Sequence, residues 1–148
     1  MKIAIYGIGR IGRNIARALF ESDKHGDIEL VAINDLGNPE TNAMLFKYDS
    51  VHGRYNGSVN VDNNDLIIDG HRVKMCAERN PADLPWGDLG IDIVMECTGV
   101  FASKEKAAAH LDGGAKKVLI SAPAGKDLPT IVFGVNDSTL TADDRIVS

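Results

Sequence analysis

The chain has 148 residues, of which 44% are hydrophobic and 25% charged, and its net charge is −5. This length fits one domain with a sizeable core. The acidic balance argues against nucleic acid and against an acidic membrane surface as partners, because both call for a basic patch.

The first 34 residues predict a strand, a helix and a second strand. Lys2–Tyr6 has the pattern of a buried strand, and apolar residues at helical spacing then continue to about Glu21. His25-Gly26 is expected to close this unit. The apolar run Ile28–Asn34 follows, and it is typical of a strand buried on both faces of a parallel sheet.

The next segment predicts a helix followed by a small antiparallel insert. Asn38-Pro39 is a helix start, with a cap residue before a proline at the first helical position, and the helix should reach about Lys47. From Val51 to Cys76 short apolar runs alternate with turn residues such as Asp62-Asn63-Asn64, which favours short antiparallel strands.

The rest of the chain returns to the alternating pattern. Asp92–Glu96 predicts a buried strand, and Ser103 should cap a helix that runs from Lys104 to Leu111. Three more strands are predicted at Lys117–Ser121, Thr130–Val135 and Ile146-Val147. This order indicates one α/β domain over residues 1–148, with a doubly wound parallel sheet of Rossmann type and a small antiparallel insert. Ligands of such sheets bind beyond the carboxyl ends of the strands.

Three glycines follow the first strand in the pattern G-x-G-x-x-G, and the strand–helix context gives this otherwise weak signal its force. Gly7 would permit the tight turn, Gly9 the approach of a diphosphate to the backbone, and Gly12 close packing of helix on strand. The backbone N–H groups of Arg10 and Ile11 would then bind the phosphates at the helix N-terminus.

An acidic residue, Asp35, follows the second strand at about the spacing that a dinucleotide site requires. Its carboxylate can accept hydrogen bonds from both adenosine ribose hydroxyls, although Asp35 could also merely start a turn before Gly37. The other loops at this edge of the sheet, Asn34–Gly37, Thr98–Phe101 and Ser121–Gly125, make Asn34, Thr98, Gly99 and Ser121 candidate cofactor-binding residues.

Two other function classes compete with a dinucleotide enzyme. A methyltransferase also pairs a glycine loop with an acidic residue, but the third glycine and the antiparallel insert argue against it. A regulator that senses NAD without chemistry of its own would need a DNA-binding or partner module, and the sequence shows none.

No targeting segment or metal site is visible in the sequence. Arg10 and Arg13 interrupt the first apolar run too early for a signal peptide. Cys76 and Cys97 fit neither a disulfide framework nor a CxxC metal site, so we expect buried thiols in a reducing cytoplasm. No sequence neighbour makes an acid or base of His110.

Seven stretches together resemble a known family: GIGRIGRN, VAIND, KYDSVHGRY, AERNP, ECTGVF, GAKKVLISAP and the final RIVS are similar to the N-terminal half of glyceraldehyde-3-phosphate dehydrogenase. The match covers the whole chain in order. RALFES and LPWGDLG also resemble the sister enzyme, erythrose-4-phosphate dehydrogenase. Asp35 favours the former, because the sister enzyme commonly has Glu at that position.

The resemblance implies NAD as cofactor, a cytoplasmic homotetramer as the full-length protein, and a role in glycolysis. It implies that Arg10 and Ile11 belong to the diphosphate-binding loop, that Asp35 accepts from the adenosine ribose and that Arg79 lies beside the adenine. Thr98 and Gly99 would lie under the diphosphate and the nicotinamide ribose, and Ser121 near the nicotinamide ribose. Phe101 would lie at the mouth of the site. Tyr6 departs from the family, which usually has Asn there; an Asn can brace neighbouring loops, and a Tyr cannot do so in the same way.

The resemblance also implies that the catalytic groups lie outside this sequence. The family forms a thioester on a Cys in the motif N-A-S-C-T-T-N, which follows IVS almost at once, whereas this chain ends at Ser148. We therefore expect an NAD-binding domain without its catalytic domain and without a catalytic residue. It should bind a sugar phosphate only together with the missing domain, be inactive alone, and use Cys97 as core filler.

Overall fold

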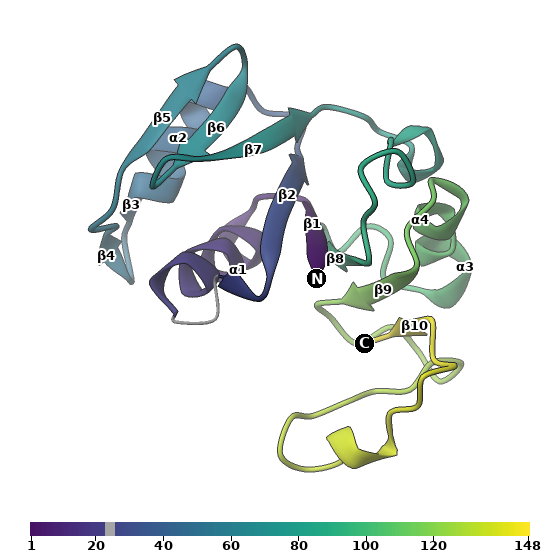
Figure 1. The fold of residues 1–148 in the computed structure, drawn as a ribbon. Helices are drawn as coiled ribbons and strands as arrows, with labels where there is room; N and C mark the ends of the chain where they lie inside the picture. The colour runs from purple at the N-terminus through teal and green to yellow at the C-terminus, as the bar shows by residue number, and fades with distance from the viewer. Residues whose placement is uncertain (23–25) are drawn as a thin grey trace.

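The computed structural model describes residues 1–22 and 26–148 (Figure 1). Its strands are β1 (Lys2–Tyr6), β2 (Glu29–Asn34), β3 (Tyr48–Asp49), β4 (Gly53–Arg54), β5 (Val59–Asp62), β6 (Asp65–Ile68), β7 (His71–Cys76), β8 (Ile93–Glu96), β9 (Lys117–Ile120) and β10 (Ile146–Val147). Its helices are α1 (Arg10–Glu21), α2 (Pro39–Lys47), α3 (Lys104–Ala107) and α4 (Ala109–Asp112), with 3₁₀ helices at Pro81–Asp83 and Asp137–Thr139.

The described strands form an eight-stranded sheet in the order β10-β9-β8-β1-β2-β7-β6-β5, beside a two-stranded antiparallel sheet of β3 and β4. The pairs from β10 to β7 are parallel, and β7, β6 and β5 pair antiparallel. The expected α/β fold with a mostly parallel sheet is confirmed. The antiparallel insert is not separate, because β7 also pairs with β2, with Asn34 opposite Cys76.

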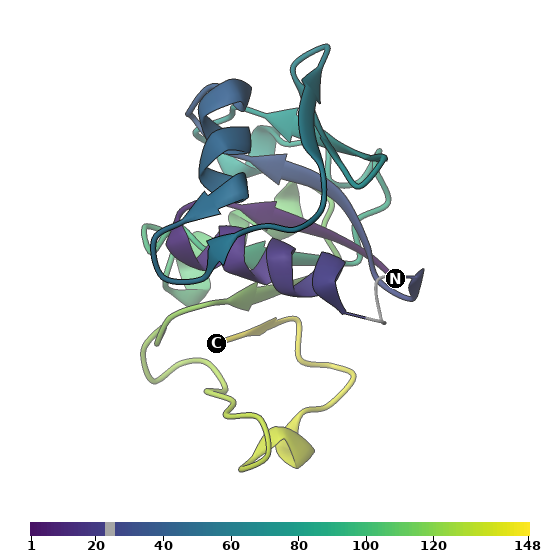
Figure 2. The ribbon, with the colours of Figure 1, turned by 90° about the vertical axis from the view of Figure 1, so that its left-hand side faces the viewer.

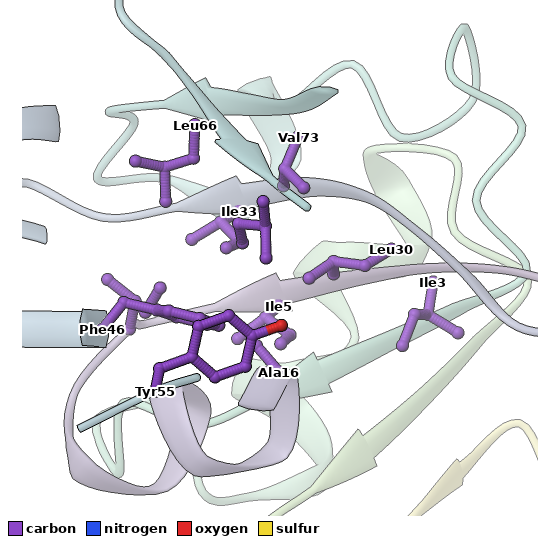
Figure 3. Packing of buried hydrophobic residues seen from close by; sticks show 11 residues of the cluster. Ile3, Ile5, Ala16, Leu30, Ile33, Phe46, Tyr55, Leu66 and Val73 are labelled. Atoms are coloured by element: carbon purple, nitrogen blue, oxygen red, sulfur yellow. The ribbon is translucent and has the colours of Figure 1, made fainter. Parts of the chain in front are cut away.

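Helices lie on both sides of the sheet, with α1 and α2 on one side and α3 and α4 on the other (Figures 1 and 2). Alternate residues of β1 accordingly face two cores. Ile3 and Ile5 belong to the cluster on the side of α1 and α2 (Figure 3), whereas Ala4 and Tyr6 belong to the cluster that contains Trp86. The central strand is therefore buried on both faces, as its continuous apolar run predicts.

The helix boundaries follow the capping residues. The side chain of Asn38 accepts a hydrogen bond from the N–H of Thr41 at 2.7 Å, which confirms the start of α2. Ser103 caps α3 in the same way, but the single helix expected up to Leu111 is two short helices that meet at Ala108. The break expected at His25-Gly26 lies partly outside the described residues. None of the described helices is long and apolar enough to cross a membrane.

The strand predicted at Thr130–Val135 is wrong. This segment belongs to a loop that extends away from the rest of the chain (Figures 1 and 2). Gly134 has a φ of +79°, and the side chain of Asn136 accepts from the N–H of Val132 at 2.7 Å, so the backbone turns instead of extending. Phe133 is 92% exposed, and Val132 and Val135 are exposed as well, so the apolar side chains of this segment do not pack into a core.

Candidate cofactor site

A cavity of about 390 Å³ opens beyond the carboxyl ends of β1, β2 and β8. This is the edge of the sheet where ligands of doubly wound folds bind. The cavity brings together six of the predicted cofactor-binding residues: Gly7, Asn34, Asp35, Arg79, Thr98 and Phe101. Four further residues, Tyr6, Leu36, Glu78 and Val100, complete its lining; of these, the sequence had singled out Tyr6 alone, and as a departure from the family.

The three glycines of the first loop are required for different reasons. Gly7 has a φ of +94°, and a Cβ there would lie 2.6 Å from Cγ2 of Thr98. A Cβ on Gly12 would lie 2.1 Å from the carbonyl oxygen of Gly7, so helix α1 could not pack at its present distance. Gly9 is different, because its Cβ would meet no atom within 4 Å. Contacts within the fold therefore do not explain a glycine at position 9, whereas a ligand lying against the backbone would.

The N-terminus of α1 has no side-chain cap. Gly9 is the N-cap residue and supplies no capping side chain, and the first turn holds no acidic residue. The first N–H groups of a helix have no partner within the helix, so those of Arg10 and Ile11 are suited to a negatively charged ligand. Both residues are exposed and are not part of the cavity lining, which includes Gly7 of the same loop.

Asp35 joins the glycine loop to the end of β2. Its Oδ2 atom accepts from the N–H of Ile8 at 3.0 Å, and its Oδ1 atom accepts from the N–H of Gly37 at 2.8 Å. The turn before Gly37 that the sequence offered as an alternative is therefore present. It does not consume the carboxylate, because each oxygen accepts more than one hydrogen bond. Asp35 can hold the loop in place and still accept from a ligand hydroxyl.

Asn34 and Tyr6 brace the segment that carries Arg79. The amide of Asn34 donates to the carbonyl of Glu78 at 2.9 Å and accepts from its N–H at 2.8 Å, so both ends of this side chain are in use. The hydroxyl of Tyr6 donates to the carbonyl of Arg79 at 2.8 Å. Burial, with a smaller contribution from Glu96, raises the pKa of Tyr6 above its usual range, which keeps this donor protonated. Tyr6 thus braces a neighbouring loop after all, through its hydroxyl.

Thr98 and its neighbours form the wall of the cavity that follows β8. The N–H of Thr98 donates to Oε1 of Glu96 at 2.8 Å, and its hydroxyl donates to the same atom at 2.5 Å. Gly99 has a φ of +76°, which explains the glycine in this turn. Ser121 follows β9 and donates its N–H to the carbonyl of Glu96 at 3.0 Å, one strand away from the cavity lining.

His110 differs from the sequence expectation, which gave it no partner. Its Nε2 atom lies 2.9 Å from Oε2 of Glu96, and both side chains are completely buried. Glu96 is on β8 and His110 on α4, so the sheet and the helix that covers it bring the two together. The two residues lie 14 positions apart on different elements, so no periodic pattern within one strand or helix links them, and the sequence gave no signal for the pair.

The two cysteines are free, and among the described residues no cluster of His, Cys, Asp and Glu could hold a metal ion. Burial raises the pKa of Cys97 to about 11, although a hydrogen bond with Ser121 offsets part of this effect. Burial also raises the pKa of Cys76. Neither thiol has the lowered pKa of a reactive nucleophile.

We therefore expect slow alkylation of Cys97. Because the thiolate is the reactive form and a raised pKa depletes it, iodoacetamide at about pH 8 should modify Cys97 at least about tenfold more slowly than in the urea-unfolded chain. The rate should rise as the pH approaches 11. Peptide mass spectrometry reports each cysteine separately, and equal rates in the folded and unfolded chain at about pH 8 would contradict this account.

Comparison with known families shows which family the chain belongs to. A family model described as "Glyceraldehyde 3-phosphate dehydrogenase, NAD binding domain" matches residues 1–104. The chain belongs to this family. It is therefore an NAD-binding domain of glyceraldehyde 3-phosphate dehydrogenase type, and the expected family and cofactor are confirmed.

Full-length relatives in bacteria agree with this assignment. The chain is 61% identical to the chromosomal glyceraldehyde-3-phosphate dehydrogenase of Cupriavidus necator, 59% identical to that of Zymomonas mobilis and 56% identical to that of Pseudomonas aeruginosa. Each match covers 100% of this chain and 44% of the relative. The chain thus spans less than half the length of these glyceraldehyde-3-phosphate dehydrogenases.

Proposed function

We propose that this chain is the NAD-binding part of a phosphorylating glyceraldehyde-3-phosphate dehydrogenase. The observation that carries the proposal is the convergence of Gly7, Asp35 and Thr98 on one cavity, in a chain whose residues 1–104 match the NAD-binding domain of that family. The relatives named above carry the name of this enzyme, which favours it over erythrose-4-phosphate dehydrogenase and over a non-catalytic NAD sensor.

The residues around the cavity fit NAD in chemical character. Gly9 leaves room for a diphosphate beside the N–H groups of Arg10 and Ile11. Asp35 would accept hydrogen bonds from the adenosine ribose, and Arg79 would lie on the adenine side. Thr98, Gly99, Phe101 and Ser121 would contact the nicotinamide half. Bound NAD would supply a hydride acceptor, and this chain would hold and orient it.

For the full-length protein, we propose oxidation of an aldehyde through a thioester to an acyl phosphate, with the nucleophile, the base and the sugar-phosphate site in a separate catalytic domain. We further propose that the full-length protein is a homotetramer that works in glycolysis in the cytoplasm. The two free cysteines support this location, because thiols stay reduced there. Comparing glyceraldehyde 3-phosphate with erythrose 4-phosphate as substrates of the full-length protein would decide between the two sister enzymes.

The 148-residue chain is expected to bind NAD weakly but measurably. The diphosphate loop and Asp35 are in place, while the nicotinamide half lacks the walls that a second domain would supply. Isothermal titration calorimetry should give a dissociation constant below about 1 mM, which corresponds to about −4 kcal/mol. No heat of binding at millimolar NAD would refute the proposed site.

The same chain is expected to show no aldehyde oxidation. Cys97 is largely protonated at neutral pH because burial raises its pKa to about 11. General acid–base help alone typically contributes about 10²–10⁴ in rate, and the proposal places both the base and the aldehyde site in the separate catalytic domain. An NADH-absorbance assay with glyceraldehyde 3-phosphate, NAD and phosphate tests this. Turnover that survives purification and disappears in Cys97→Ser would make Cys97 the nucleophile.

A further inference from the structure

A buried hydrogen-bond network connects the core of the domain to the wall of the cavity. Nε1 of Trp86 donates to Nδ1 of His110 at 3.2 Å, and Nε2 of His110 lies 2.9 Å from Oε2 of Glu96. The other carboxylate oxygen of Glu96 accepts from the N–H and the hydroxyl of Thr98. Trp86 and His110 are 0% exposed and Glu96 is 1% exposed, so these groups depend on one another as partners.

The direction of each hydrogen bond in this network is fixed. An indole nitrogen can only donate, so Nδ1 of His110 must accept, and the ring proton must be on Nε2, where it points at Glu96. Both hydrogen-bond partners of the Glu96 carboxylate, His110 and Thr98, are then donors. The hydroxyl of Thr98 gives its proton to Glu96 and accepts from the N–H of Val100 at 3.0 Å.

The Thr98 end of this hydrogen-bond network lies in the cavity lining. Thr98, Val100 and Phe101 line the cavity, whereas Glu96, His110 and Trp86 do not. The rings of Tyr6 and Phe101, which also line it, pack edge-on against the ring of His110 with centroids 4.8 and 6.4 Å away. A change in the position of His110 or Glu96 would therefore reach one continuous wall of the cavity.

We propose that Glu96, held by His110 and Trp86, is a positioning residue that sets the orientation of Thr98 against the bound cofactor. The proposal rests on the assignment of the cavity as the NAD site. It makes Trp86 a built-in reporter, because a ligand that contacts Thr98 changes the hydrogen bonds that Glu96 accepts, and His110 transmits this change to the indole N–H.

Glutamine cannot replace Glu96 in this arrangement, although it has the same shape. Its amide offers one acceptor and one donor, whereas both Thr98 and His110 present donors to position 96. If the amide oxygen serves Thr98, the amide NH₂ opposes Nε2–H of His110. The reverse orientation opposes the N–H and hydroxyl of Thr98. In either orientation, position 96 loses its hydrogen bond to one end of the network.

The test uses nuclear magnetic resonance on the 148-residue chain, in which Trp86 is the only tryptophan and gives one indole N–H resonance. In the parent chain, NAD should shift this resonance together with the amides of Ile8 and Thr98, and the ring ¹⁵N shifts of His110 should show the proton on Nε2. In Glu96→Gln, saturating NAD should no longer shift the indole, and NAD affinity should fall by about tenfold, as for losing one hydrogen bond to a charged group.

Ile68→Val on β6 is the matched control, because it trims a completely buried side chain outside the cavity lining. It should lower stability while NAD affinity and the indole response stay unchanged. Shifts at Ile8 and Thr98 without one at the Trp86 indole would overturn the positioning role and leave the cofactor site standing. An unchanged indole response in Glu96→Gln would overturn the positioning role as well. So would a His110 ring proton on Nδ1 in the parent chain, and this measurement does not depend on the folding of any variant. Unmoved amides at Ile8 and Thr98 would refute both proposals.

Discussion

Replacing Gly9 with alanine is expected to leave the chain folded and to weaken NAD binding by at least about tenfold, or 1.4 kcal/mol. The new Cβ meets no atom of the chain within 4 Å, and Gly9 has a φ of −67° and a ψ of −162°, which alanine adopts without strain. The methyl group would instead occupy the space beside the helix N-terminus that the diphosphate needs. Calorimetry with NAD and thermal unfolding measure the two effects separately.

Gly12→Ala is the contrasting variant from the same loop. Its Cβ would lie 2.1 Å from the carbonyl oxygen of Gly7 and 3.0 Å from a methyl carbon of Ile5, so helix α1 must move away from β1. Overpacking of this kind costs about 1–3 kcal/mol, and a clash with backbone belongs at the upper end. We therefore expect Gly12→Ala to lower the melting temperature clearly and Gly9→Ala to leave it nearly unchanged. The opposite order would show that Gly9 serves the fold and not the ligand.

A preference for NAD over NADP of at least about tenfold is the second large effect that we expect. The 2′-phosphate of NADP adds about −1.5 to −2 charges, close to the carboxylate that the 2′-hydroxyl of NAD would reach. Two unit charges 4 Å apart repel by about 4 kcal/mol at an effective dielectric constant of 20, before solvent reduces the effect. NADP also loses a hydrogen bond to a charged group, which is worth about 1.5–3 kcal/mol.

Asp35→Ala should narrow this gap by weakening NAD binding and relieving the repulsion of NADP. Asp35→Asn removes the charge and keeps one acceptor oxygen for the N–H of Ile8, but its amide NH₂ cannot accept from the N–H of Gly37. Asp49→Asn is the control for loss of a carboxylate charge, since one oxygen of Asp49 accepts from the N–H groups of both Val51 and His52 and Asp49 lies outside the cavity lining. Equal affinities of the parent chain for NAD and NADP would refute Asp35 as the ribose acceptor.

The sequence predicted the parts of the site that depend on local pattern. The apolar run Lys2–Tyr6, the glycines after it and Asp35 at the end of β2 each carry a local signal, and a parallel sheet brings strand ends to one edge. Arg79 follows β7 and came from the family resemblance alone. It lines the cavity because β7 pairs with β2, a long-range pairing that the spacing of residues does not reveal.

The parts that the sequence did not predict depend on tertiary contacts. Glu96 and His110 form a buried pair only because α4 covers β8, and the brace from Asn34 to Glu78 spans two strands. The strand expected at Thr130–Val135 failed for the opposite reason. Its residues have the right local character, but only Ile131 bonds to the chain beside it, through its N–H to the carbonyl of Ser148 at 2.8 Å, among the backbone bonds of the described residues, and Gly134 and Asn136 favour a turn.

A crystal structure of the 148-residue chain with NAD would test the central claim most directly. It should place the diphosphate beside Gly9 and the N-terminus of α1, with the adenosine ribose hydroxyls within hydrogen-bond distance of the Asp35 carboxylate and Thr98 against the nicotinamide half. NAD density elsewhere on the chain, or an adenosine ribose beyond hydrogen-bond distance of Asp35, would contradict the assignment of this cavity as the cofactor site.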